Sequence, residues 1–332
     1  MENFSNVLAL RVLLTLGYSQ VFSYPLTAQE IWLRLVVKHT GVKEGDSGNW
    51  AKNSSLIEVK KALLQLVSAQ KIICKNGYYF FSNNEKGVIS RQERYRYSKL
   101  KWNEVSSFIE QVRHIPWIQG IAVTGSLAVN NVAEGEDIDF MIVTDPHRLW
   151  LTRVWVSGLA QIQGKRRSWK REDQNSWCFN LWLSSDQLKM PTSLHTVYGA
   201  YEVCQAEWVY MRPKSGVGVS FLKENHWARW YVPHLYAKKL VDVGRFIENQ
   251  LFKQKLSLRQ KVEFEHVLRL IDPVLFVFNY IFYGVQFLYM RRHMTREKVS
   301  LHSAFFHPRN TKFGIYEMWK LQLSSLSKGA GQ

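Results

Sequence analysis

Two aspartates and a Gly-Ser turn are the residues whose types and spacing best suit chemistry. An apolar run ends at Gly125-Ser126, and Asp137-Ile138-Asp139 opens a second apolar run. Short apolar runs bounded by Gly and polar turns are typical of buried strands. Because side chains alternate along a strand, Asp137 and Asp139 are expected on one face. Two such carboxylates suit Mg²⁺, which prefers oxygen ligands and bridges substrate phosphates.

The Gly-Ser turn supplies the other half of such a site. The LAVNN segment that follows Ser126 predicts a short helix. A helix N-terminus offers free backbone N–H groups to a phosphate. Gly125 lets the backbone come close to that phosphate, and the Ser126 hydroxyl can add a hydrogen bond.

With ten residues between Ser126 and Asp137, the pattern resembles the signature of the DNA polymerase β-like nucleotidyltransferase superfamily, over roughly residues 111–184. The resemblance implies an α+β fold with a nucleotidyltransferase-type mixed sheet. It also implies transfer of a nucleoside monophosphate from an NTP to RNA, a protein or a small molecule. Asp137 and Asp139 would hold Mg²⁺ or Mn²⁺, and Gly125 and Ser126 would hold the β- and γ-phosphates.

Asn180 occupies the position where the superfamily usually carries a third carboxylate, on the strand predicted over residues 176–184. An amide can bind a metal or orient a hydroxyl, but it cannot act as a general base. Three alternatives stay open. The reaction tolerates Asn180, or Glu172 or Asp173 reaches the site, or the protein is an inactive regulator that binds nucleotide or nucleic acid.

The chain is strongly basic, with a net charge of +17 over 332 residues. This favours a phosphate-rich partner such as a nucleotide, a nucleic acid or an anionic membrane. Lys165 and Arg167 in the KRRSWKR segment are candidates for the nucleotide phosphates, and an ordinary basic surface turn is an equal alternative. Three isolated cysteines argue against disulfides or a zinc site and favour the cytoplasm.

The amino-terminal part resembles a winged helix-turn-helix domain. Capping boxes at Thr27–Glu30 and Ser55–Glu58 open two helices, and Asn76-Gly77 is a strong hairpin signal. Contact with nucleic acid, docking of a protein and a lid over the substrate all stay open as its role. The basic helix predicted over 86–115 either presents a solvated face or grips a phosphate backbone.

The predicted organisation has four parts. A winged helix-like domain covers 1–84, a connecting helix 85–115, the nucleotidyltransferase core 116–186 and a helical C-terminal domain 187–332.

Two features of the C-terminal part matter for function. Apolar residues from Val197 to Trp208 have helical spacing. Glu202 and Glu207 either join the site or lie exposed on the polar face of that helix, and the exposed position is favoured. Asp272-Pro273 is expected to open an apolar helix that ends at Arg291. Its apolar stretch is shorter than a typical membrane span, so a buried central helix is favoured over a membrane contact.

Overall fold

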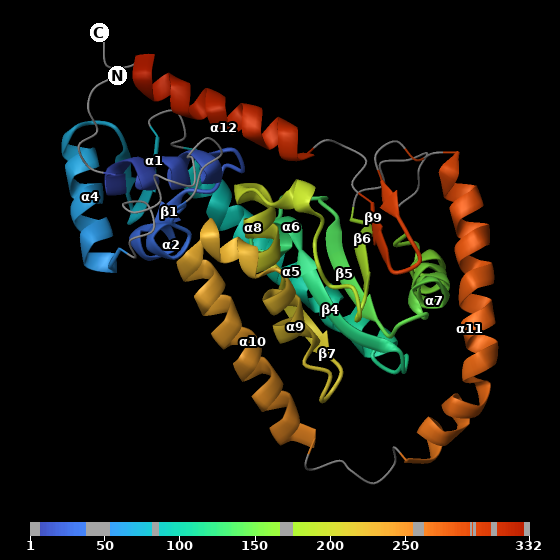
Figure 1. Ribbon diagram of the computed structural model, residues 1–332. Helices are drawn as coiled ribbons and strands as arrows, with labels where there is room; N and C mark the ends of the chain where they lie inside the picture. The colour runs from blue at the N-terminus through green and yellow to red at the C-terminus, as the bar shows by residue number, and fades with distance from the viewer. Residues whose placement is uncertain are drawn as a thin grey trace.

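The computed structural model describes residues 7–37, 54–81, 86–166, 175–254, 262–292, 294, 297–306 and 311–328. These residues form an α+β fold with eleven α-helices, a mixed six-stranded sheet and a small three-stranded antiparallel sheet (Figure 1). The predicted α+β class is therefore confirmed.

The six-stranded sheet is the centre of the fold, with strand order β7-β4-β5-β6-β9-β8. The strands β5 and β6 pair in parallel, and the other neighbours pair antiparallel. The strand bounds are β4 (Ile118–Thr124), β5 (Ile138–Thr144), β6 (Trp177–Ser184), β7 (Glu207–Met211), β8 (Lys298–Val299) and β9 (Ser303–Phe305). The three strands predicted around the Gly-Ser and Asp-x-Asp motifs are confirmed.

The other three strands come from the part of the chain expected to be helical. Helix α8 (Val197–Gln205) ends before Trp208, which lies on β7. The helical spacing through Trp208 was misleading because β7 gains more by pairing with the edge of β4. Glu207 begins that strand and forms an ion pair with Lys239 at 2.7 Å. The sheet thus extends beyond the predicted core boundary at 186.

Helices cover both faces of the sheet, and strand alternation decides which residues meet them. Ile121 and Val123 of β4 pack in one cluster with α5 (Gly87–Val112) and α7 (Leu149–Ile162). Ala122 packs in the opposite cluster with α8 and further helices. The remaining helices around the sheet are α6 (Gly125–Ala128), η3 (Thr192–Leu194), α9 (Val217–Glu224), η4 (His226–Trp230), α10 (Pro233–Gln254), α11 (Val262–Arg291) and α12 (Thr311–Lys328).

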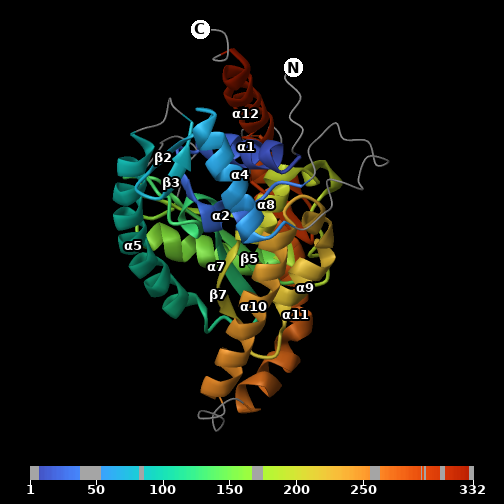
Figure 2. The same cartoon turned by 90° about the vertical axis from the view of Figure 1, so that its left-hand side faces the viewer.

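The amino-terminal elements form a unit with its own apolar cluster. Figure 2 shows α1, α2 and α4 together on one side of the molecule, with α5 running along its edge. Both capping boxes and the Asn76-Gly77 hairpin are confirmed. The bounds are α1 (Val7–Gln20), α2 (Ala28–Leu33), α4 (Leu56–Ser68), β1 (Leu26–Thr27), β2 (Ile73–Lys75) and β3 (Tyr78–Phe80).

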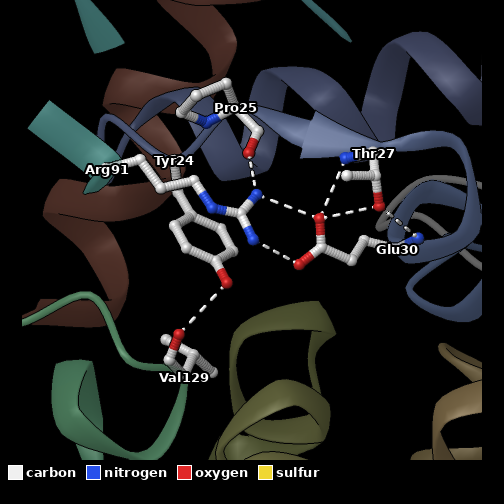
Figure 3. A network of polar contacts seen from close by, with 6 residues as sticks. All are labelled: Tyr24, Pro25, Thr27, Glu30, Arg91 and Val129. Carbon is white, nitrogen blue, oxygen red and sulfur yellow. Dashed lines mark hydrogen bonds and ion pairs between the residues drawn. The ribbon is translucent and has the colours of Figure 1, made fainter. Parts of the chain in front are cut away.

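An ion pair fastens this unit to α5. The Arg91 guanidinium donates to both carboxylate oxygens of Glu30, at 2.5 and 2.9 Å, and to the Pro25 carbonyl (Figure 3). It also lies over the ring of Tyr24, 4.2 Å from its centroid. Lys101 is buried and donates to Asn175 at 3.1 Å. For these two basic residues, the prediction of a solvated face on α5 is therefore wrong.

The same network reaches the loop that follows the Gly-Ser turn. The Tyr24 hydroxyl donates to the Val129 carbonyl at 3.1 Å (Figure 3). Trp102 of α5 donates its indole N–H to Asn130 at 2.7 Å. Because Val129 directly follows α6, the amino-terminal unit and α5 together position the start of this loop.

The predicted start of the apolar helix is wrong. Helix α11 begins at Val262, and Pro273 lies inside it. The pyrrolidine nitrogen has no hydrogen to donate to the preceding turn. Arg148 donates to both the side chain and the backbone carbonyl of Asp272, and these contacts hold the chain beside the proline.

We expect Arg91→Ala to lower the free energy of unfolding by about 1 to 3 kcal/mol near neutral pH. Burial raises the pKa of Glu30, but hydrogen bonding and the charge of Arg91 more than offset this and leave the pKa lowered. A lowered carboxyl pKa contributes stability above the ordinary value of 4.5, which is lost as pH falls through the folded value.

Urea unfolding at about pH 7 and about pH 3 checks this, because the ion pair acts only while Glu30 is ionised. Arg96→Ala is the matched control, since Arg96 is exposed on the same helix. An equal loss of stability at both pH values would contradict the role given to Glu30.

Candidate active site

Asp139 sits near the start of β5, between two neighbouring strands. It lies opposite Thr124 of β4 and beside Cys178 of β6. Its neighbours Ile138 and Phe140 are fully buried, so the strand has little freedom to rotate. The sheet therefore fixes the direction of this carboxylate.

The backbone of Gly125 lies directly against the carboxylate of Asp139. Gly125 has a φ of +66°, and a Cβ added to it would lie 2.4 Å from Oδ2 of Asp139. Both the left-handed backbone and the missing side chain are needed at this position. The predicted convergence of the turn and this aspartate is thus observed.

Asn180 completes one side of the cluster. Its Nδ2 atom donates to Oδ1 of Asp139 from the adjacent strand β6. Asp137 is held by the same segment of chain, since its Oδ1 accepts the backbone N–H of Ser176 at 2.9 Å. Both aspartates are therefore anchored by residues at the start of β6.

Glu202 was expected either in the site or on an exposed polar face, and the exposed position was favoured. In the structure α8 turns this side chain into a pocket beside Asn180 and Thr124. Burial, and then the nearby charge of Asp139, raise the pKa of Glu202 to about 7. Within the described residues its carboxylate makes no direct hydrogen bond. One signal was present, because α8 contains no Lys or Arg to pair with it.

The pocket has a mainly apolar lining with a few polar groups. Burial and the charges of Glu202 and Asp139 raise the pKa of Tyr198, so its hydroxyl stays protonated. An apolar cavity with a few convergent polar groups is the usual character of a ligand site. Its lining residues are Thr124, Met141, Asn180, Leu181, Met190, Leu194, Tyr198, Gly199, Glu202, Val203, Ala206, Phe221 and Phe305.

Two of the residues proposed for phosphate contact have other partners. The Ser126 hydroxyl donates to the Glu136 carboxylate at 2.8 Å, so a phosphate there would have to displace this bond. Lys165 forms an ion pair with Glu104 of α5 at 2.9 Å. Arg167, the other proposed phosphate contact, lies outside the described residues.

Glu172 and Asp173, the alternatives considered for the third carboxylate, also lie outside the described residues. Among the described residues, we consider Glu202 for the role of the third carboxylate, because the charge of Asp139 raises its pKa.

Asp137 and Asp139 carry the carboxylate oxygens that a hard divalent cation prefers, and Asn180 carries an amide oxygen. Among the residues described, no three His, Cys, Asp or Glu side chains form a complete metal site. Mg²⁺ commonly uses one or two protein carboxylates and takes its other ligands from water and substrate phosphates. A bound cation would relieve the repulsion between Asp139 and Glu202.

No protein-family model, curated protein or solved structure matches this chain. Its function is therefore inferred from this geometry together with the superfamily resemblance of the motifs.

We expect Gly125→Ala to destabilise the fold by about 1 to 3 kcal/mol and to displace the Asp139 carboxylate. Gly158→Ala is the matched control, because Gly158 lies in α7 with open space around its Cα. That change should be neutral or stabilise the helix by up to about 1 kcal/mol. Thermal unfolding of the two variants measures the difference. Equal stability of the two would show that the turn does not contact Asp139 as described.

We expect Glu202→Gln to raise the free energy of unfolding by about 1 to 3 kcal/mol at about pH 8, with little change at about pH 5. A carboxyl pKa raised from 4.5 to about 7 costs folded-state stability as pH rises between these values, and glutamine avoids that cost. Denaturant unfolding without divalent cations measures it.

The control is Glu224→Gln, since Glu224 is an exposed residue outside the pocket. It should change stability little at either pH. A stabilisation by Glu202→Gln that does not depend on pH would contradict the raised pKa.

Proposed function

We propose that this protein is a metal-dependent nucleotidyltransferase that moves a nucleoside monophosphate from an NTP to a hydroxyl. The observation that carries the proposal is the contact of Asp139 with Gly125 and Asn180, together with the effect of the Asp139 charge on Glu202 of α8. Gly125 and Asp139 belong to the motif that resembles the superfamily, whereas Asn180 departs from the superfamily pattern. Glu202 would supply the carboxylate that this departure removes.

The sheet supports the same assignment at the level of fold. The glycine turn joins the antiparallel strands β4 and β5, and the Asp-x-Asp motif stands at the start of β5. The parallel strand β6 then brings Asn180 to the same place. We assign this arrangement to the nucleotidyltransferase type, with a winged helix-like unit before it made of α1, α2, α4 and the β2–β3 hairpin.

Asp137 and Asp139 would hold Mg²⁺ or Mn²⁺. Such a cation, when bound, neutralises charge on the triphosphate and activates the acceptor. Asn180 keeps Asp139 in place through its amide N–H. In this scheme Asn180 orients a metal ligand and has no role in proton transfer.

Glu202 is our candidate for the general base. A carboxylate with a pKa of about 7 can accept a proton near neutral pH. The acceptor hydroxyl gives its proton to Glu202, and its oxygen forms a bond to the α-phosphorus. The bond from that phosphorus to the bridging oxygen breaks, and pyrophosphate leaves with the electron pair. The pocket beside Glu202 would receive the acceptor.

The alternative is a regulatory protein that binds nucleotide or nucleic acid without turnover. Two observations favour it, namely the amide at position 180 and the engagement of Ser126 by Glu136. In this reading the N-terminal unit, which Tyr24 ties to the loop after α6, responds to the bound ligand.

Incubation with Mg²⁺ and each α-labelled NTP, with candidate RNA, protein and small-molecule acceptors, tests the proposal. We expect transfer of label with release of pyrophosphate. Asp139→Asn and Glu202→Gln should each lower kcat by about 100-fold or more. For Glu202→Gln, binding of the NTP should persist, and the limb of the pH–rate profile near pH 7 should disappear.

Asp186→Asn and Glu224→Gln are the matched controls, because both residues are exposed and lie outside the pocket. They should leave transfer unchanged. Binding of an NTP without pyrophosphate release under any of these conditions would favour the regulatory alternative. Full activity of Glu202→Gln would remove Glu202 from the mechanism but leave the metal ligands in place.

A further inference from the structure

Helix α11 directs polar side chains toward the protein. Asn279 is buried, and its Oδ1 accepts the backbone N–H groups of Trp150 and Leu151 at 2.9 and 3.2 Å. These groups lie in the first turn of α7, where backbone donors lack partners within the helix. Gln286 donates to the Trp150 carbonyl at 3.1 Å and also accepts from Arg153. Polar contacts therefore make up much of the docking of α11.

The outer side of the same helix is apolar. Residues 273–290 contain no charged side chain. Val285 and Leu288 are 60% and 63% exposed. The prediction of a buried central helix is therefore wrong. The other exposed large apolar residues of this face are Ile271, Val274, Val277, Phe278, Ile281 and Tyr289. Phe276 and Tyr280 are also exposed in part, but their rings lie against His147.

The inner side of α11 also has apolar contacts, since Met290 is buried and the Tyr283 ring packs against Trp150. An ordinary surface helix, in contrast, turns polar residues to solvent. Monomeric soluble proteins seldom expose an apolar patch that is continuous over several turns, and such patches usually mark an interaction surface. In Figure 1, α11 runs along the edge of the molecule beside α7, and its far side meets no other labelled element.

We propose that the outer face of α11, defined by the exposed residues above, lies in the surface of an anionic lipid bilayer with the helix parallel to the membrane. Charge complementarity selects this partner. The apolar stretch ends at Arg291 and Arg292, which are both exposed, and the chain as a whole carries +17.

Composition also fits the membrane interface. The exposed face mixes aliphatic residues with Phe278 and Tyr289. Tyrosine suits the boundary between lipid and water, because its ring is apolar and its hydroxyl is polar. A helix with such an apolar face and basic flanking residues binds in the plane of the interface, where attraction to anionic lipids adds to apolar burial.

The segment Ile271–Arg291 is long enough and apolar enough to cross a bilayer. Its contacts favour the surface. Crossing would expose Asn279 and Gln286 to lipid and break their bonds with α7. It would also separate Asp272 from Arg148. Lying flat keeps all of these contacts.

This orientation leaves the candidate active site free. The pocket is lined by Met141 and Leu181 on the sheet face covered by α8. Helix α11 packs on the other cluster, through Met290 and the residues around α7. The inference therefore does not depend on the proposed function.

Flotation of the full chain with lipid vesicles tests the proposal. One set contains phosphatidylcholine with about one third phosphatidylglycerol, and the other contains phosphatidylcholine alone. We expect binding to the anionic vesicles that weakens as salt rises. The double change Val285→Glu with Leu288→Glu should weaken binding by about ten-fold or more.

Leu64→Glu with Leu100→Glu is the matched control, because these residues are 65% and 67% exposed on other helices. It should bind vesicles as the original chain does. Thermal unfolding of both variants shows that the fold is intact. Two results would overturn the proposal. One is no binding to anionic vesicles. The other is a dimer in light scattering that dissociates with the α11 variant, which would make a second copy the partner of this face.

Discussion

The backbone at Gly125 and the carboxylate of Asp139 approach one another so closely that a single methyl group would not fit between them. This approach requires antiparallel pairing of β4 and β5 with Thr124 opposite Asp139, and it requires a left-handed residue at the end of β4. Every other part of the candidate site is placed relative to this contact. The parallel strand β6 adds Asn180, and α8 adds Glu202 from above the sheet.

The carboxylates of Asp139 and Glu202 are coupled by their charges. Asp139 is satisfied in part by the Asn180 amide, whereas Glu202 is partly buried close to that negative charge. A buried carboxylate near a like charge lowers the stability of the fold. Groups whose pKa is shifted in this way concentrate at functional sites. Under the function that we propose, the third acid comes from helix α8 in place of strand β6, which would allow an amide at position 180.

The sequence predicted well those features that depend on neighbouring residues. Capping boxes, the Asn76-Gly77 turn and the strands around Asp139 are encoded within a few residues, and all were found where expected. Trp208 was misplaced because pairing with β4 ends α8 early, and that partner lies far away in the sequence. Glu202 lies within α8, and its place in the pocket depends on how that helix packs on the sheet. The position of Asn180 on a strand could be predicted from the local sequence. Its hydrogen bond to Asp139 could not, because that bond depends on the register between β5 and β6.

The exposure of helix α11 is another feature that the local sequence pattern did not predict. Its apolar content predicted burial, since hydrophobic residues usually face a core. The few polar residues decide otherwise, because Asn279 and Gln286 meet the exposed backbone groups and polar side chains at the start of α7. Once those two residues face inward, helical periodicity places Ile281, Val285 and Leu288 on the outer side. The candidate pocket lies on the sheet face covered by α8, and α11 packs on the opposite cluster. A membrane bound to the outer side of α11, as we propose, would therefore lie across the sheet from the candidate pocket.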